Sequence, residues 1–210
     1  MTKLTKKIMA VSMPALLLAA CTKDPLDYLS VDDTRIYTTD YDSTTDFTSF
    51  KTYSISDSVT YIDNGVSTKE LAGIDVSYID AVDEYMQQRG YTKVKRFNNP
   101  DLGININRIY STETDVIDYT TYWSFYGGYW DPYYWGYGGY DYGYPYGYGS
   151  YSYTTAAESI DMLDLKNAAA NGQIDIIWTG LVRGQEILDT ANADDAVEAL
   201  FNQSPYLQSK

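Results

Sequence analysis

The segment Gln173–Arg183 reads QIDIIWTGLVR and carries the strongest strand pattern in the chain. Apolar and polar residues alternate along it, which is typical of a β-strand with one face on a core. The alternation predicts that one set of side chains faces the same way, namely Ile174, Ile176, Trp178 and Val182. The opposite face is then predicted to carry Asp175, Thr179 and Arg183.

The segments before and after this strand in the sequence also have patterns that predict secondary structure. Ala193–Phe201 has helical spacing, with Asp194 as the expected N-cap and Ser204-Pro205 as the stop signal. The apolar stripe of this helix consists of Ala196, Val197, Leu200 and Phe201. On the other side, Ser159–Leu165 is a predicted strand. Asn171-Gly172 between the two strands is a hairpin turn signal, although the alanines before it could also end a short helical turn.

The first half of the chain adds more strands and a long helix. The predicted strands are Arg35–Asp42, Phe47–Ile55, Tyr91–Phe97 and Leu102–Tyr110. Apolar residues at helical spacing predict a helix over Glu70–Arg89, closed by Gly90 in a left-handed cap. Ser67 and Glu70 have the spacing of a capping box, but Gly73 leaves open a shorter helix capped by Asp75.

These elements predict an α+β two-layer sandwich, in which a mixed or antiparallel sheet carries two helices on one face and a Tyr/Gly-rich insertion. Apolar residues from both helices and from the strongest strand should form the core. The predicted core residues are Ile79, Val82, Met86, Ile176, Trp178, Leu200 and Phe201.

The insertion, Tyr119–Tyr153, holds more than half of the 24 tyrosines and three of the four tryptophans. We expect its ends, Tyr119–Tyr129 and Ser150–Ala156, to pair as strands and Gly127–Gly149 to form a mobile tip, because glycine is too frequent there for a regular strand. Three interpretations stay open: a structural extension, a recognition surface and a disordered low-complexity loop. The candidate contact residues are Trp123, Tyr126, Tyr129, Trp130, Tyr133, Tyr134, Trp135, Tyr137 and Tyr140.

Basic residues are absent from the insertion and its flanks. Ile109–Leu165 contains no Lys or Arg, so we expect no cation–π contacts within the segment and no phosphate binding by it. The nearest basic group, Lys93, Lys95 and Arg96, alternates in strand fashion and is predicted to be a solvated face.

The N-terminus has the pattern of a lipoprotein signal. Lys3, Lys6 and Lys7 precede the short apolar run Ile8–Ala20, which is too short for a typical membrane-spanning helix. Leu18-Ala19-Ala20-Cys21 resembles the lipobox of bacterial lipoproteins, in which the cysteine thiol is lipidated. A plain secretory signal followed by a chance or buried cysteine is the alternative.

The pattern therefore predicts a signal peptide over 1–20, a tether over 21–33 and one domain over 34–207, anchored by acyl chains on Cys21. Thr22 follows the cysteine, and by resemblance to Gram-negative sorting rules the absence of Asp there favours the outer membrane, facing the periplasm or the cell surface.

Composition excludes several classes of function. Lys and Arg total 15 against 29 Asp and Glu, and no cluster marks a nucleic-acid surface. The chain has no histidine and one cysteine, which removes imidazole chemistry, an internal disulfide and a Cys-cluster zinc site. Asp32-Asp33 and Asp194-Asp195 are adjacent carboxylates, interpreted as tether and helix-cap residues. The sequence predicts no catalytic residue, metal site or cofactor.

The order of the motifs resembles the domain-of-unknown-function family 4136, bacterial envelope lipoproteins, over roughly 35–206. The matching pieces are Tyr41-Asp42, Phe47, Phe50-Lys51-Thr52-Tyr53, Arg89-Gly90-Tyr91, Asn99-Pro100-Asp101-Leu102, Ile177-Trp178-Thr179-Gly180 and Pro205. The resemblance implies an α+β domain behind a lipobox, and it implies no established catalytic residues.

Two functions follow as hypotheses. The first is a non-catalytic, lipid-anchored envelope protein that mediates interaction or assembly through its aromatic loop. The alternative is a carbohydrate-binding surface lipoprotein with Tyr and Trp as stacking platforms. An enzyme is a third hypothesis, and no motif supports it.

Overall fold

The computed structural model describes residues 34–63, 66–110, 132–143 and 156–210. In these ranges, nine strands form one open sheet. The strands are β1 (Ile36–Tyr41), β2 (Thr52–Ile55), β3 (Val59–Asp63), β4 (Val66–Glu70), β5 (Thr92–Lys93), β6 (Leu102–Tyr110), β7 (Asp141–Gly143), β8 (Ala157–Asp164) and β9 (Gln173–Arg183). The helices are α1 (Gly73–Gln88), α3 (Ala168–Asn171) and α4 (Ala193–Gln203). Short 3-10 turns are η2 (Phe47–Ser49), η3 (Arg96–Asn98), η4 (Pro132–Trp135) and η5 (Thr190–Asn192).

Strand β8 lies at the centre of the sheet, antiparallel to β6 on one side and to β9 on the other. The outer side of β9 is shared, because its start pairs with β7 in parallel and its end pairs with β1 antiparallel. The outer side of β6 is shared in the same way by β2 and β3, both parallel to it. Beyond them, β5 pairs with β2 and β4 pairs with β3. The sheet is therefore mixed.

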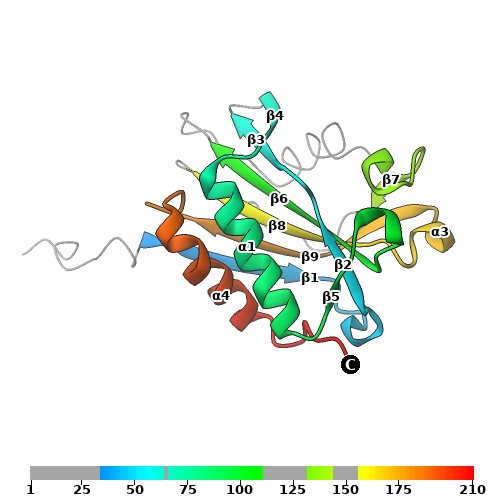
Figure 1. Ribbon diagram of the computed structural model, residues 1–210. Coiled ribbons are helices and arrows are strands. Elements are labelled where there is room, and N and C mark those ends of the chain that lie inside the picture. The colour runs from blue at the N-terminus through cyan, green and yellow to red at the C-terminus, as the bar shows by residue number, and fades with distance from the viewer. Residues whose placement is uncertain (1–33, 64–65, 111–131, 144–155) are drawn as a thin grey trace, which may run out of the picture.

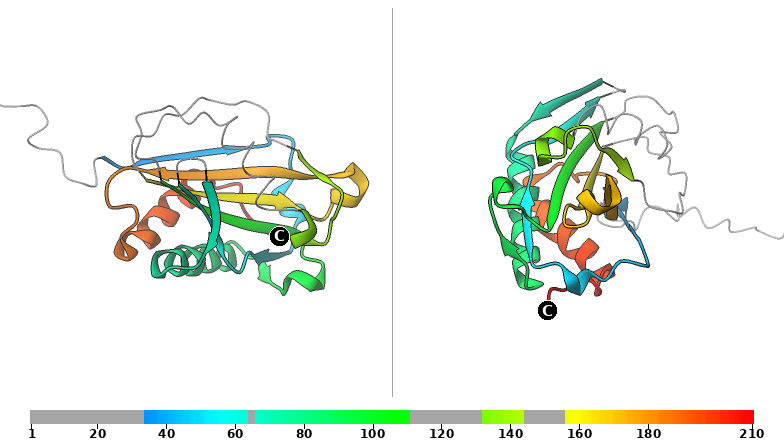
Figure 2. Two further views of the ribbon diagram at one scale, coloured as in Figure 1. Left: turned by 90° about the horizontal axis from the view of Figure 1, so that it is seen from above. Right: turned by 90° about the vertical axis from the view of Figure 1, so that its right-hand side faces the viewer.

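Helices α1 and α4 lie side by side on one face of this sheet (Figure 1; Figure 2). Their apolar stripes and that face of the sheet enclose the larger core, in which Trp178 packs on Phe201 and donates its indole N–H to Ser204 Oγ at 2.9 Å. The predicted α+β class is confirmed. Of the predicted core residues all are buried except Ile79, which packs against the core while partly exposed.

The prediction that Ile174, Ile176, Trp178 and Val182 of β9 all face the same way is wrong, because the strand changes its facing at Ile177. Trp178 pairs with Met162, but Ile176 pairs with Leu163, so Ile177 is an extra residue that forms a bulge. The bulge interrupts the alternation. Ile177 and Trp178 both join the core under the helices, whereas Ile174 and Ile176 belong to a second core on the opposite face.

The capping predictions are corrected at two helices. Val66–Glu70 is strand β4 rather than the start of a helix, so Ser67 and Glu70 form no capping box. The alternative of a shorter helix capped by Asp75 is confirmed, because α1 begins at Gly73 and Asp75 Oδ2 accepts the Ala72 N–H at 2.6 Å. Asp194 is not an N-cap: it lies in the first turn of α4, where a negative charge still complements the helix dipole.

Other element ends also differ from the sequence pattern. Phe47–Ile55 begins as the turn η2, with Asp46 accepting the Thr48 N–H, and becomes a strand only at Thr52. Tyr91–Phe97 contributes just two strand residues before η3. The alanines before Asn171 form the short α3, and Gly172 ends it with φ +69°, which confirms the helical-turn alternative.

The described part of the aromatic insertion, residues 132–143, crosses one end of the sheet face opposite α1 and α4, and we call it the strap (Figure 2). Trp135 packs over Gly103 of β6, where an added Cβ would lie 3.1 Å from the indole ring. The Tyr137 hydroxyl donates to the Leu165 carbonyl at 2.6 Å, and Tyr142 is buried where β7 joins β9.

The prediction of a mobile tip is therefore wrong for residues 132–143. Burial of Trp135 and Tyr142 in the second core holds this part against the sheet. The predicted strands Tyr119–Tyr129 and Ser150–Ala156 lie outside the described residues apart from Ala156.

Replacement of Gly180 by alanine tests the close packing of α4 on the sheet. A Cβ at Gly180 would lie 2.6 Å from the Trp178 ring and 2.9 Å from Leu200, so we expect Gly180→Ala to lower the free energy of unfolding by about 1–3 kcal/mol. Urea denaturation measures the change. Gly73→Ala is the control, since open space surrounds that position and the stability should stay unchanged or rise by up to about 1 kcal/mol. Equal losses in both variants would contradict the packing argument.

Candidate recognition surface

Arg96 lies in η3, directly before the turn into β6, and its guanidinium contacts two aromatic rings. The guanidinium carbon is 4.4 Å from the ring centroid of Phe97 and 4.4 Å from that of Tyr134. Its Nη1 also donates to the Tyr134 carbonyl oxygen at 3.1 Å. These contacts fix a long side chain in one place, so Arg96 differs from the solvated residue that the sequence predicts.

Tyr134 receives a second cation on its ring. Lys69 Nζ of β4 lies 4.9 Å from the ring centroid, and the Tyr134 hydroxyl accepts the Asp57 N–H at 2.9 Å. Burial raises the pKa of Tyr134 above its ordinary value, so the ring stays neutral at physiological pH. Both cations come from outside Ile109–Leu165. Counting the basic residues within the insertion therefore could not reveal these two cation–π contacts.

Two rings beside this cluster face solvent. Phe97 is 77% exposed and Tyr133 is 71% exposed, the two highest values among the large apolar side chains of the described residues. The Tyr133 ring covers Gly138, where an added Cβ would overlap the ring, so glycine permits this placement. We call Arg96, Phe97, Tyr133 and Tyr134 the aromatic–arginine surface.

A cleft of about 210 Å³ adjoins this surface. It is lined by Arg96, Asn99, Pro100, Trp135, Gly136, Tyr137 and Leu165. Asn99 has φ +49°, a left-handed conformation that asparagine tolerates better than most residues. The buried Trp135 N–H has no hydrogen-bond acceptor among the described residues. The polar side chains that line the cleft are those of Arg96, Asn99 and Tyr137.

The structure separates the predicted contact residues into different environments. Tyr133 and Tyr134 belong to the aromatic–arginine surface, whereas Trp135 is buried and serves the second core. Tyr137 and Tyr140 are partly exposed, with ring centroids 5.7 Å apart. The remaining predicted site residues lie outside the described part, namely Cys21, Trp123, Tyr126, Tyr129 and Trp130.

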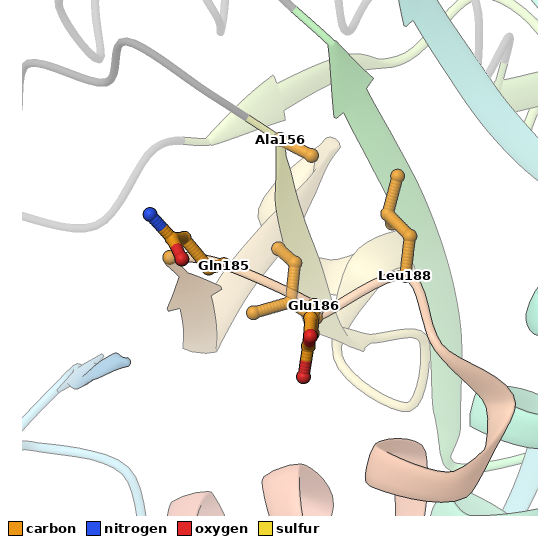
Figure 3. Close-up of a pocket in the computed structure, with 6 residues that line it drawn as sticks. Ala156, Gln185, Glu186 and Leu188 are labelled. Atoms are coloured by element: carbon orange, nitrogen blue, oxygen red, sulfur yellow. The ribbon is translucent and has the colours of Figure 1, made fainter. Parts of the chain in front are cut away.

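A second cavity of about 250 Å³ lies at the other end of β9. It is lined by Ala156 and the loop Gly184–Leu188, and Figure 3 shows the Gln185 and Glu186 side chains directed away from one another. Glu186 is half-exposed and lies 3.9 Å from Arg35, as an ion pair. The polar groups of this loop do not converge on one point, so the cavity offers no evident arrangement for catalysis.

Charged residues are buried beneath the start of α1. Arg108 of β6 pairs with Glu70 at 2.6 Å and with Asp75 at 3.0 Å, and Asp75 is fully buried. Glu158 of β8 lies opposite Arg108 in the sheet and is also buried, but neither of its carboxylate oxygens has a hydrogen-bond partner among the described residues. Burial raises the pKa of Glu158 well above its ordinary value, and the negative charge of Asp75 adds to this effect.

Glu158 is not among the residues predicted from the sequence, although one sequence signal points to it. It is a charged residue inside a strand whose neighbours are apolar or small on both sides, AAESIDML. Within the described residues, no three His, Cys, Asp or Glu side chains are grouped so that they could hold a metal ion. The helices in that part are also too short or too polar to span a bilayer.

Comparison with known proteins places this α+β domain in a class defined by sequence and fold. A family model described as a domain of unknown function (DUF4136) matches residues 37–206. The crystal structure of a DUF4136 family protein from Bacteroides thetaiotaomicron is 30% identical with a TM-score of 0.70, covering 85% of this chain and 100% of that one. The chain belongs to the DUF4136 family.

Two further structures are more distant. The PelC dodecamer from Paraburkholderia phytofirmans is 10% identical with a TM-score of 0.42, covering 84% of this chain and 99% of that one. A PDZ domain protein from Parabacteroides distasonis is 14% identical with a TM-score of 0.40, covering 82% and 36% of the two chains. A comparison with curated proteins finds no match.

The buried Glu158 carboxyl predicts a pH dependence of stability. Its folded-state pKa is raised, so its favourable contribution is complete below the unfolded-state pKa, near 4.5, and is lost as pH rises toward the folded-state pKa. Glu158→Gln stays neutral throughout. Relative to the native chain, we expect it to gain stability as the pH rises from 4 to 8, because only the native chain loses the contribution of its neutral carboxyl over that range.

Urea denaturation at several pH values measures this difference. Glu198→Gln on the exposed side of α4 is the matched control, and its difference from the native chain should not change with pH in this way. A pH-independent difference for Glu158→Gln would show that this carboxyl is ionised in the folded protein.

Proposed function

We propose that the protein is a non-catalytic, lipid-anchored protein of the bacterial cell envelope that recognises a partner through the aromatic–arginine surface. The observation that carries the proposal is the exposure of Phe97 and Tyr133 around a guanidinium held in place by Phe97 and Tyr134. Exposed aromatic side chains and arginine are enriched where proteins contact partners.

The register of β9 favours an orientation for this surface. The chain enters the domain at β1, whose Ile36 pairs with Arg183 at the end of β9, whereas the strap joins Gln173 at its start. At about 3.3 Å per residue, these two ends lie roughly 30 Å apart. An anchor at Cys21 would therefore hold the domain by one end and direct the aromatic–arginine surface away from the membrane.

The lipobox resemblance at Leu18–Cys21 supports the anchor, and Thr22 directly after the cysteine favours an outer-membrane location. We expect Cys21→Ser to abolish palmitate labelling and to move the chain out of the membrane fraction, because the thiol that takes the lipid is gone. Metabolic labelling and fractionation measure both effects. Thr22→Ser is the control and should keep the label; label retained by Cys21→Ser would refute lipidation at this residue.

Recognition by the surface is tested by cross-linking in intact cells. We expect the double variant Phe97→Ser/Tyr133→Ser to lose at least about 80% of its cross-linked partners, since the rings that form the contact are removed. Quantitative mass spectrometry measures the recovery, and the melting temperature should hold because both side chains are exposed.

Val66→Ser is the matched control, because Val66 is 67% exposed on β4 and lies outside the aromatic–arginine surface. It should recover the same partners as the native chain. Equal recovery from the double variant and the control would mean that the aromatic–arginine surface is not the recognition site.

Carbohydrate binding is a second candidate, favoured by the cleft of about 210 Å³. Pockets for drug-sized ligands occupy about 300–1,000 Å³, so this cleft suits a single small unit such as one sugar ring. Its walls combine aromatic rings with a planar amide and a guanidinium, from Tyr137, Asn99 and Arg96. Such groups offer an apolar face to ring C–H groups and donors to hydroxyl oxygens.

A further inference from the structure

We infer that the cleft binds a sugar unit that carries a carboxylate, such as one uronic acid residue of a polysaccharide. The inference rests on the carbohydrate-binding candidate above and adds the chemical class of the sugar. Three features of the cleft carry it: its charge, the fixed position of that charge and the donors beside it.

The charge comes from Arg96. Among the described residues that line the cleft, Arg96 alone is charged. Three other arginines contact groups of the chain itself: Arg35 and Arg108 pair with carboxylates, and Arg89 donates to carbonyl oxygens at the end of α4. Arg96 makes no ion pair in the described part of the chain, although acidic residues outnumber basic ones about two to one. Its positive charge is therefore left for a ligand.

The position of that charge is set before any ligand arrives. The Phe97 and Tyr134 rings contact the guanidinium, and one of its N–H groups is bonded to the Tyr134 carbonyl oxygen. The other N–H groups form a planar fork, which matches the two oxygens of a carboxylate. Because the side chain is already ordered, binding loses little side-chain entropy.

The donors beside Arg96 suit the hydroxyl groups of a sugar ring. The Asn99 amide is exposed at the cleft and has no hydrogen-bond partner among the described residues. The partly exposed Tyr137 ring also lines the cleft, and its hydroxyl donates to the Leu165 carbonyl oxygen. A uronate can bind both side chains, because its carboxylate can pair with Arg96 while its ring hydroxyls accept from the Asn99 amide.

The formal charge of −14 does not prevent an acidic ligand from binding here. Charges separated by more than about 8 Å are largely screened at physiological ionic strength, so the groups close to the cleft decide its potential. Lys69 reinforces Arg96 through the shared Tyr134 ring. The Asp164 carboxylate, near Tyr137, accepts hydrogen bonds from the backbone N–H and the side-chain amide of Asn167, which are its partners in the structure.

Calorimetric titration of the full chain in detergent tests the inference with trigalacturonate and its methyl ester as probes. The two trimers share the sugar ring, and the ester lacks the negative charges. We expect the acid to bind at least about tenfold more tightly than the ester. Arg96→Gln should weaken binding of the acid by about tenfold, because the guanidinium is lost.

Lys95→Gln is the matched control, since it removes one positive charge from the neighbouring exposed residue outside the cleft. It should change the affinity less than about twofold. If Arg96→Gln fails to fold, Asn99→Asp replaces it: an almost isosteric change at an exposed residue that should weaken binding of the acid more than binding of the ester.

Equal affinity for acid and ester in the native chain would overturn the carboxylate assignment and leave carbohydrate binding standing. Equal weakening of the acid by Arg96→Gln and Lys95→Gln would also overturn it, because the effect would then be one of net charge. No heat from either trimer would overturn the inference and the carbohydrate candidate together. The cross-linking result would still decide whether the surface recognises a protein.

Discussion

One extra residue in β9 determines how this domain uses its sheet. Ile177 has no counterpart opposite it in β8, so the strand changes facing between Ile176 and Trp178. Ile174 and Ile176 before the bulge then join the core under the strap, whereas Trp178 and Val182 after it join the core under α1 and α4. In a regular strand, Ile174, Ile176, Trp178 and Val182 would all have faced the same side of the sheet. The sheet face opposite α1 and α4 would then have lost Ile174 and Ile176, which pack beneath the strap.

The second core gives the aromatic strap a fixed base. Trp135 and Tyr142 are buried between the strap and the sheet, while Tyr133 and Phe97 remain outside. A tyrosine-rich stretch therefore divides its residues between two tasks. Some fill space against β6 and β9, and others form the aromatic–arginine surface with a cation supplied by another part of the chain.

Much of the sheet and both long helices could be predicted from the sequence, because their periodic patterns are strong. The bounds of β6 and β9 agree with the predicted ones, and the α+β class follows from them. The sequence predictions failed where a local sequence pattern competed with strand pairing in the folded chain. Ser67 and Glu70 have a good capping spacing, yet β3 offers this segment a strand partner across the hairpin.

The candidate site was harder to predict than the fold. Phe97, Arg96 and Lys69 are separated from the strap in sequence, and only the chain path brings them to Tyr134. The environment of the buried Glu158 was hidden in the same way, because the charged groups that act on it, Asp75 and Arg108, come from α1 and β6. Periodicity reports which face a residue occupies, but it does not report which residues of other elements share that place.

The position of the strap at the start of β9 has a consequence for how such proteins diversify. Exposed positions such as Tyr133 take no part in either core, so substitutions there carry little cost in folding free energy. The buried positions Trp135 and Tyr142 are constrained by the sheet beneath them. Evolution can thus exchange the outer residues for new specificities while it retains the inner ones, as happens in loops carried on rigid scaffolds. Within the twelve residues of the strap, buried positions that must be preserved therefore stand beside exposed positions that are free to change.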